Sequence, residues 1–361
     1  MPPTVAPDAT TTTPDAAPRK AVALISGGLD SLLAARVVLD QGVHVEGINF
    51  YTGFCVEAHT STLRAKEGDA PRRNNALWVA EQLGIKLHII DIAEEYKAIV
   101  LNPKYGYGQH LNPCLDCKIF MVGRAQAWAD EHGFDFIVTG EVVGQRPKSQ
   151  RKNAMPLIAR ESGAADRLLR PLCAKNLLET LPERSGWVDR NALFGFHGRN
   201  RKPQIELAAH YGFTDYAQPA GGCCFLTNEQ YSAKLTDLWE SRGVRDYTLD
   251  DVLLLKIGRH IRPAAHYKLI VSREQSEVFY LEGYTNSFIA LRCLSHVGPM
   301  ALVDGAPSAA DLELAASLLA RYSQGRTTDR VTIGVERPGA PGAVLTVRPL
   351  LPEAVPHAWH V

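Results

Sequence analysis

Six consecutive residues near the start of the chain, Ser26-Gly27-Gly28-Leu29-Asp30-Ser31, have the types and the order needed to bind a phosphate group. A β-favouring run, residues 21–25, leads into them, and helix-favouring residues follow from Leu32. Glycines let the backbone approach an anion closely, and the free N–H groups in the first turn of a helix point towards it. Asp30 and Ser31 are suited to cap that helix. The spacing differs from Gly-x4-Gly-Lys-Ser/Thr and from Gly-x-Gly-x-x-Gly, so a phosphate site of another type is predicted.

A pair of cysteines supplies a second group of reactive side chains. Cys114-Leu115-Asp116-Cys117 directly precedes an expected helix that starts near Lys118. The positive end of a helix lowers the pKa of a nearby thiol, so both cysteines are placed to act as thiolates. The motif is compatible with a zinc knuckle, a redox pair or an iron–sulfur cluster. Zinc would need two further ligands at suitable spacing, and the chain has no second Cys-x-x-Cys.

A third thiol comes from the segment Gly221-Gly222-Cys223-Cys224, where two glycines allow a crowded backbone. Two thiolates from the first motif and one from this segment would hold a [4Fe–4S] cluster and leave one iron open for a substrate or sulfide. The alternatives are a redox-active disulfide between the two motifs and inert buried thiols. Cys55, Cys173 and Cys293 lie in apolar surroundings and are predicted to be core thiols.

The composition is that of a globular protein large enough for two domains. The chain has 361 residues, of which 45% are hydrophobic and 22% charged, and its formal net charge is zero. Nucleic acid would therefore have to bind to local basic patches. The seven cysteines are too sparse for a disulfide scaffold. Residues 1–18 are predicted to be a disordered tail and not a secretion signal, and no apolar run is long enough to span a bilayer. We expect a cytoplasmic protein with reduced thiols and no membrane partner.

Strands and helices are expected to alternate through the first part of the chain. Strand patterns cover residues 21–25, 44–50, 86–92 and 134–139, and helical patterns cover residues 74–83 and 120–132. This alternation predicts an α/β fold with a doubly wound parallel sheet, in which ligands bind at the carboxyl ends of the strands. Ser31, Asn49 and Gly140 all lie at or just beyond expected strand ends.

The pattern changes beyond about residue 231. Expected strands at 253–257, 267–271, 288–293, 331–335 and 344–347, with one helix at 309–322, predict a second, smaller α+β domain. The predicted division is a tail at 1–19, a first domain at 20–230 and a second domain at 231–361.

The loop Ser26–Ser31 resembles the PP-loop of the ATP pyrophosphatases, the adenine nucleotide alpha hydrolase-like enzymes that cleave ATP between its α- and β-phosphates. Together with the cysteine motifs and the run Thr139–Gln150, it makes residues 20–227 resemble the tRNA thiouridine synthetases. The match is closest to the PP-loop part of the 4-thiouridine synthetases and more distant from the 2-thiouridylases. The segment Leu169–Leu172 is similar to the family's Arg-Pro-Leu segment. The 4-thiouridine enzymes carry an RNA-binding domain before the PP-loop, where this chain has a short tail. Lys256–His260 resembles part of a small RNA-associated domain in ribosome-linked proteins.

This resemblance implies an ATP-dependent tRNA sulfurtransferase that adenylates a uridine carbonyl and replaces its oxygen with sulfur. The expected phosphate-binding residues are Ser26, Gly27, Gly28 and Ser31. Asp30 is expected to hold Mg²⁺ or only to cap the helix. Asn49 is expected at the adenine, and Gly140 and Gln145 at the adenylate or the target base.

The sulfur-delivering residues implied by the resemblance are Cys114, Cys117 and Cys224. They would act as [4Fe–4S] ligands, or as a persulfide and its resolving thiol. Alignment on the following Phe-Leu-Thr favours Cys224 as the third thiol, and alignment on the glycine pair favours Cys223 as the alternative.

The expected partners are tRNA and a sulfur donor, either free sulfide or a cysteine desulfurase. The candidate RNA-binding patches are Arg146, Lys148, Arg151 and Lys152, followed by Arg199, Arg201 and Lys202. The second domain is expected to bind RNA, to pair two copies into a homodimer, or both. Two other functions stay open: a PP-loop ligase that acts on a small molecule and has a zinc site, and a non-catalytic RNA-binding accessory protein.

Overall fold

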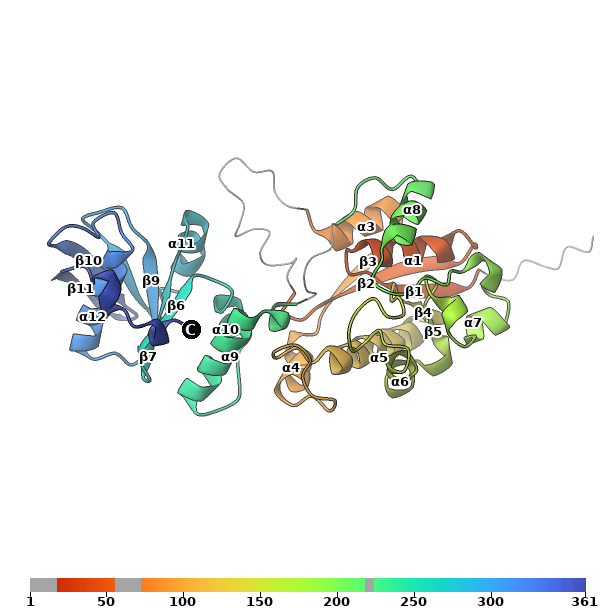
Figure 1. Cartoon of the computed structure of the whole chain (residues 1–361), viewed down its shortest axis with the longest axis horizontal. Coiled ribbons are helices and arrows are strands. Elements are labelled where there is room, and N and C mark those ends of the chain that lie inside the picture. The colour runs from red at the N-terminus through yellow and green to blue at the C-terminus, as the bar shows by residue number, and fades with distance from the viewer. Residues whose placement is uncertain (1–17, 56–72, 218–223) are drawn as a thin grey trace, which may run out of the picture.

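The computed structural model describes residues 18–55, 73–217 and 224–361, which form two lobes (Figure 1). The first lobe contains β1 (Lys20–Leu24), α1 (Leu29–Leu39), β2 (His44–Tyr51), α3 (Asn75–Leu83), β3 (Leu87–Asp91), α4 (Ala93–Leu101), α5 (Cys114–His132), β4 (Phe136–Val138), α6 (Ala154–Glu161), β5 (Leu168–Leu169), α7 (Leu181–Arg184) and α8 (Lys202–His210). The rest of the chain contains α9 (Glu229–Arg242), α10 (Leu249–Leu254), β6 (Arg259–Ala264), β7 (Tyr267–Val271), α11 (Gln275–Glu282), β8 (Ile289–Cys293), β9 (Met300–Gly305), α12 (Ala309–Arg321), β10 (Val331–Arg337) and β11 (Ala340–Val347).

The first lobe is a doubly wound parallel sheet, as the sequence predicts. In the described residues its strand order is β3-β2-β1-β4-β5, and each neighbouring pair is parallel. Alternate residues of β1 enter different cores, because side chains along a strand point to opposite faces. Ala21 and Ala23 pack with α1, α3 and α8, whereas Val22 packs with α5 and α6. The order reverses between β2 and β4 on either side of β1, which is where ligands bind in such sheets.

The second lobe is an antiparallel sheet with the strand order β11-β10-β8-β9-β7-β6 in the described chain. Helix α12 packs against one face of this sheet, and α11 packs against the other. The α+β prediction is confirmed, and the expected helix at 309–322 corresponds to α12. Strand β9 and helix α11 were not expected.

Two expectations, at residues 253–257 and at the start of α5, differ clearly from the structure. Residues 253–257 were expected as a strand, but Leu253 and Leu254 end helix α10 and the strand follows at β6. Thr248 and Asp251 form a capping box that starts α10, and an apolar run of this length does not separate strand from helix by itself. Helix α5 begins at Cys114 and not near Lys118, since the amide of Cys117 already donates to the Pro113 carbonyl at 2.8 Å.

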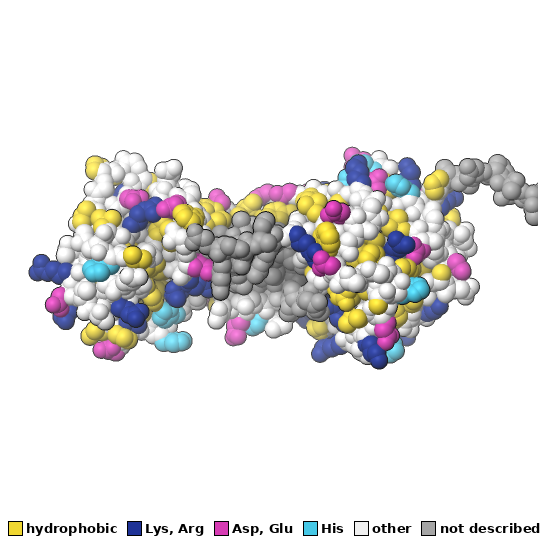
Figure 2. Space-filling view, turned by 90° about the horizontal axis from the view of Figure 1, so that it is seen from above, with side chains coloured by type: hydrophobic (Ala, Val, Ile, Leu, Met, Phe, Trp, Pro, Cys, Tyr) yellow, Lys and Arg dark blue, Asp and Glu magenta, His cyan; other side chains and the backbone are white. Residues whose placement is uncertain are grey.

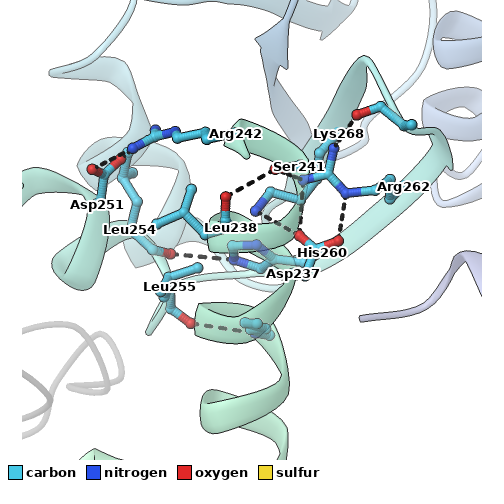
Figure 3. Close-up of polar contacts among 12 residues, drawn as sticks. Asp237, Leu238, Ser241, Arg242, Asp251, Leu254, Leu255, His260, Arg262 and Lys268 are labelled. Carbon is cyan, nitrogen blue, oxygen red and sulfur yellow. Dashed lines mark hydrogen bonds and ion pairs between the residues drawn. The ribbon is translucent and has the colours of Figure 1, made fainter. Parts of the chain in front are cut away.

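Helix α9 joins the two lobes and packs against both. Asp237 of α9 accepts hydrogen bonds from Arg262 of β6 and from the buried Lys268 of β7 (Figure 3). Burial raises the pKa of Asp237, but Arg262 and Lys268 lower it by a larger amount. The net pKa therefore lies below its usual range. Other residues of α9, including Tyr231 and Trp239, pack in a core with α4 of the first lobe. The helix therefore packs in a hydrophobic core with the first lobe and is held to β6 and β7 by hydrogen bonds.

Within the described residues, no helix combines the length and the apolar character required to cross a bilayer.

Candidate nucleotide and sulfur site

The phosphate loop connects β1 to α1 with a backbone that requires glycine. Gly27 has a φ of +82°, and a Cβ there would lie 2.7 Å from the Cβ of Asn75. Gly28 is the N-cap of α1, and no side chain makes a capping hydrogen bond there. The Ser31 hydroxyl donates to the Gly28 carbonyl at 2.8 Å and lies 3.4 Å from the Ser26 hydroxyl. The loop thus combines an uncapped helix start with two hydroxyl groups, which suits an anion.

Asp30 does not cap the helix, which corrects the cap-only alternative, and Ser31 is not an N-cap either. Asp30 lies within the first turn, and its carboxylate accepts hydrogen bonds from Gln145 at 2.6 Å and from Arg201 at 3.4 Å. Gln204 of α8 donates to the side-chain oxygen of Gln145 at 3.0 Å. The phosphate loop, the segment after β4 and α8 are held together by this network. Arg201 and Gln204 act as partners here, and only Arg201 had been singled out, as part of a basic patch.

The segment after β4 lies directly against the first turn of α1. A Cβ on Gly140 would lie 2.3 Å from the Asp30 carbonyl oxygen and 2.7 Å from the Ser31 nitrogen. Backbone is the obstacle in both cases, so only glycine permits this approach. Asn49, at the end of β2, donates to the Ile25 carbonyl at 2.7 Å. The predicted residues of this group are therefore brought together at the carboxyl edge of the sheet.

A buried ion pair sits next to Gly140. Glu141 is 2% exposed, and its carboxylate accepts hydrogen bonds from Arg170 at 3.1 Å and from Thr139 at 3.1 Å. Burial raises the pKa of Glu141, but the charges of Lys118 and Arg170 lower it by a larger amount. The net pKa is therefore below the usual range. Lys118 lies 4.0 Å from Glu141 and follows Cys117 directly in α5. The contact links the cysteine-bearing helix to the segment beside the phosphate loop.

The cysteines of the first motif lie in the first turn of α5. The Cys114 thiol is 3.3 Å from the Ser149 hydroxyl, and the Cys117 thiol is 3.9 Å from the Met121 sulfur. The Cys224 thiol lies 3.8 Å from the side-chain oxygen of Asn112, two residues before Cys114. Cys117 and Cys224 pack against the same hydrophobic core. The structure therefore brings Cys224 to the cysteine motif across more than 100 residues of sequence, since Asn112 and Cys224 are 112 positions apart.

Cys223, the alternative third thiol, lies outside the described residues. Among the residues that are described, no group of three His, Cys, Asp or Glu side chains could hold a metal ion. The described thiols by themselves do not form the three-ligand site that a [4Fe–4S] cluster would need.

Cys173 and Cys293 support the expectation of core thiols, whereas Cys55 lies beside the candidate sulfur site. Cys173 is fully buried, and burial raises the pKa of its thiol to about 12. Burial also raises the pKa of Cys293 to about 11. Cys55 is partly buried, as Cys293 is, and its backbone forms a β-bridge with Cys224. It belongs to the neighbourhood of the candidate sulfur site and not to a remote core.

Lys256, which follows the C-terminal end of α10, also lies near Cys55 and Cys224. It was not identified from the sequence as a site residue. It is 8% exposed and donates to the Gly53 carbonyl at 2.5 Å. Burial lowers the pKa of Lys256 to about 8, although the nearby Cys55 and Cys224 thiols act in the opposite direction. The only sequence signal was its position at the start of the RNA-associated resemblance.

Two family models match the chain, one in each part. The model described as "tRNA methyl transferase HUP domain" matches residues 19–163, and the model described as "NFACT protein RNA binding domain" matches residues 258–360.

The curated relatives are thiouridylases. The "tRNA-specific 2-thiouridylase MnmA" of Syntrophotalea carbinolica is 35% identical over 121 residues, which is 32% of this chain and 32% of that protein. The enzyme of the same name from Roseiflexus sp. is 26% identical over 262 residues, covering 67% of this chain and 66% of that protein. The match thus spans about a third of the length of the first relative.

A solved structure described as a 4-thiouridine synthetase–RNA complex with bound ATP is 23% identical, with a TM-score of 0.36, and covers 54% of this chain and 41% of that chain. The curated relatives belong to the group that the sequence resembles more distantly, and the overall family resemblance is confirmed. Residues 19–163 therefore match the tRNA methyl transferase HUP domain model, residues 258–360 match the NFACT RNA-binding domain model, and part of the chain is similar to tRNA-specific 2-thiouridylases.

Proposed function

We propose that this protein is an ATP-dependent tRNA sulfurtransferase. The observation that supports this most strongly is the Lys118–Glu141 contact of 4.0 Å, because it joins the cysteine-bearing helix to the segment beside the phosphate loop. An activating site and a sulfur-delivering site would then share one edge of the sheet. A protein that used only the phosphate loop, or only the cysteine pair, would not need the two to lie at the same edge of the sheet.

In the activation step, a uridine carbonyl oxygen attacks the α-phosphorus of ATP, and pyrophosphate leaves. Gly27, Gly28, Ser26 and Ser31 would hold the pyrophosphate portion through backbone and hydroxyl donors. Asp30 would bind Mg²⁺, which usually takes one or two carboxylates together with substrate phosphates. Gln145 and Arg201 already orient the Asp30 carboxylate by hydrogen bonds.

Around the adenosine and the activated base, Asn49, Gly140 and Gln145 are the proposed contacts. Asn49 lies near the end of β2 and donates to the Ile25 carbonyl just after β1, and Gly140 lets the segment after β4 pack closely against the first turn of α1. The activated oxygen would leave as part of AMP once sulfur has added to the same carbon of the base.

Sulfur delivery is assigned to Cys114, Cys117 and Cys224. In the thiol form of this proposal, one cysteine carries a persulfide whose outer sulfur attacks the activated carbon, and AMP departs. A second cysteine then attacks the inner sulfur, which frees the thiolated base and leaves a disulfide for an external thiol to reduce. Lys256 would place a positive charge near the Cys55 and Cys224 thiols of this neighbourhood.

The [4Fe–4S] cluster is a finer proposal that rests on the chemistry of the donor set. Three thiolates, with Cys223 or Cys224 as the third, would leave one iron open to carry sulfide when a cluster is bound. Anaerobically purified protein would then contain iron and absorb near 400 nm. Colourless, iron-free protein that still thiolates RNA would reject the cluster and keep the thiol form.

Several parts of this function have support only from chemistry and resemblance. We propose tRNA as the substrate, with free sulfide or a cysteine desulfurase as the sulfur source, and action in the cytoplasm. The homodimer and the domain division at 19/20 and 230/231 are likewise proposals.

Mass spectrometry of the nucleosides from a deletion strain and its parent tests the function directly. We expect one thionucleoside to disappear from tRNA and to return with the wild-type gene but not with Cys114→Ala. An unchanged set of thionucleosides would contradict the proposal. Zinc in the purified protein, together with that unchanged set, would favour the small-molecule ligase instead.

A further inference from the structure

A surface groove lies between the end of α9 and the chain segment that leads to Cys114. It encloses about 570 Å³ and is lined by Tyr107, Leu111, Thr236, Trp239, Val244 and Arg245, together with Glu240 and Gly243. This volume is within the range of about 300–1,000 Å³ that is typical of small-molecule sites. We call it the α9 groove. Helix α9 is the element between the two lobes in Figure 1, so the groove belongs to their junction.

The walls of the α9 groove present flat, stackable surfaces. The Arg245 guanidinium lies 4.7 Å from the centre of the Trp239 ring and 5.4 Å from that of Tyr107. Arg245 is exposed, whereas Trp239 is 8% exposed and fixed in the core that α9 shares with α4. The Arg245 guanidinium covers the Trp239 ring and donates to the Tyr107 hydroxyl, and planar arginine groups and aromatic rings are surfaces on which single-stranded nucleic-acid bases stack.

The wall of the groove contains a buried hydrogen-bond donor that the described residues do not use. The indole Nε1 of Trp239 is buried and has no hydrogen-bond partner among the described residues. A buried unpaired donor is costly, and the carbonyl oxygen of a ligand would relieve that cost only if the groove wall moved to expose the nitrogen. Uracil and the other oxo bases supply such a carbonyl in the plane of a flat ring.

The charges around the groove favour an anionic ligand on one side. Lys148 donates to the Tyr107 carbonyl, so this lysine of the basic segment 146–152 reaches the wall of the groove. Of the nearby acidic side chains, Asp246 is paired with Lys97 at 2.6 Å. Glu240 is exposed, so water screens its charge. The basic side chains visible in Figure 2 are scattered over both lobes, so RNA binding would need such a local combination.

The groove also ends beside the candidate sulfur site. Leu111 lies in its wall, and the adjacent Asn112 contacts the Cys224 thiol at 3.8 Å. A nucleotide in the groove would therefore be close to the cysteines without occupying the phosphate loop.

We propose that the α9 groove binds an unstacked nucleobase of the RNA substrate, with Arg245 and Trp239 stacking on the base and the loop 146–152 contacting phosphate. The inference rests on the proposed function, because it assumes that RNA is brought to this site. The groove holds the RNA beside the cysteines while another nucleotide is activated. Arg245 is thus a substrate-positioning residue and has no part in ATP cleavage.

Binding of single-stranded RNA to the full chain tests this proposal. The probes are a fluorescently labelled octauridylate and an abasic ribose-phosphate oligomer of the same length and charge. Wild-type protein should bind octauridylate more tightly than the abasic oligomer. Arg245→Ala should weaken octauridylate binding at least about fivefold, since stacking contributes roughly 1–3 kcal/mol per base. Arg245→Lys keeps the charge but loses the planar group, and should recover less than half of that loss.

Arg160→Ala is the matched control, because Arg160 is an exposed arginine on α6 whose side chain is 72% exposed. It should bind both probes as the wild type does. Equal binding of the two probes by wild-type protein, or equal binding of octauridylate by the Arg245→Ala and Arg160→Ala variants, would overturn the proposal. Loss of a co-purifying protein from Arg245→Ala with normal octauridylate binding would mark the groove as a peptide site and overturn it as well.

The outcome is separable from that of the proposed function. If the deletion strain keeps all its thionucleosides but Arg245→Ala weakens octauridylate binding, the groove is supported as an RNA site and thiolation is rejected. If thiolation is observed and Arg245→Ala binds octauridylate normally, the groove inference alone is overturned.

Discussion

Arg170 and Glu141 form an ion pair that is buried on both sides. The Arg170 Nε lies 3.1 Å from the Glu141 carboxylate, and the two side chains are 5% and 3% exposed. Arg170 also donates to the Met155 carbonyl at 3.2 Å, which satisfies part of its remaining hydrogen-bonding capacity. The pair fixes the chain just beyond the carboxyl ends of β4 and β5. It gives a structural reason for an arginine in the segment Leu169–Leu172.

Replacing Arg170 by methionine should destabilise the protein strongly. The substitution keeps most of the side-chain volume but leaves Glu141 with Lys118 at 4.0 Å as its nearest cation. Breaking a buried pair in this way costs about 3–5 kcal/mol. Urea unfolding measures the effect. Arg184→Met is the control, because Arg184 pairs with Asp166 at the surface, where a pair contributes at most about 1 kcal/mol. Equal losses in the two variants would contradict the prediction.

Gly140→Ala should impair ATP use before it impairs folding. The new Cβ would meet backbone atoms of Asp30 and Ser31 at 2.3–2.7 Å, so the first turn of α1 must move away. Because the phosphate loop leads into that turn, we expect pyrophosphate release from ATP to fall at least about tenfold. Gly342→Ala is the control, since its Cβ meets only the Val335 carbonyl at an ordinary 3.4 Å. Pyrophosphate release at the wild-type rate in Gly140→Ala would show that the close approach is unimportant.

Single cysteine variants should separate activation from sulfur transfer. Cys114→Ala, Cys117→Ala and Cys224→Ala are each expected to reduce tRNA thiolation at least about 100-fold, because residues that act as a unit fail together. Each should still release pyrophosphate, since none belongs to the phosphate loop. Cys293→Ala, in the second lobe, is the control and should thiolate normally. If Cys223→Ala is inactive while Cys224→Ala is active, the third thiol has been assigned to the wrong residue.

Lys234 should make the stability of the protein rise with pH in the alkaline range. Burial, aided by Arg273 and Lys268, lowers the pKa of Lys234 to about 8 in the folded protein, against about 10.4 for an unfolded chain. Between these values the unfolded state binds a proton that the folded state has released. The free energy of unfolding therefore increases as the pH rises from about 8 to about 10.

Urea unfolding of the wild type and of Lys234→Met at pH 7.5, 8.5 and 9.5 measures this contribution. Between pH 7.5 and 9.5 the free energy of unfolding should rise by up to about 2 kcal/mol less in the variant than in the wild type. The rise that the variant keeps should come from the buried Lys256. Lys202→Met removes a lysine whose side chain is 77% exposed and should keep the wild-type slope. Parallel curves for the wild type and Lys234→Met would show that Lys234 is not perturbed.

The first lobe could be predicted from sequence because its signals are local. The loop Ser26–Ser31 lies between an apolar strand and a helix, and the rule for parallel sheets brings Asn49 and Gly140 to the same edge. Gln145 follows Gly140 by only five residues. The cap assignment of Asp30 failed because capping residues and residues of the first turn have similar preferences, and only the contacts to Gln145 and Arg201 separate the two.

The residues that sequence reasoning missed depend on distant contacts. Lys256 donates to the Gly53 carbonyl, which is 203 positions away in the sequence. The backbone β-bridge between Cys55 and Cys224 likewise joins segments that share no local pattern. A lysine near an apolar run usually lies at the surface, so its burial follows only from how α10 packs on the first lobe. The strand expected at 253–257 failed for a related reason, because short apolar runs fit either element.

The order of strands in the first lobe has a consequence for how the chain is made. The central strand β1 is synthesised early, yet its partner β4 comes far later, and the Lys20 amide donates to Asp135 across 115 positions. At about 5–20 residues per second, the ribosome needs on the order of ten seconds to supply the second edge of that strand. During this interval β1 can pair only with β2, and the backbone groups on its other edge have no strand partner until β4 is synthesised. A nascent chain of this protein would thus benefit from a chaperone that covers β1 until β4 emerges.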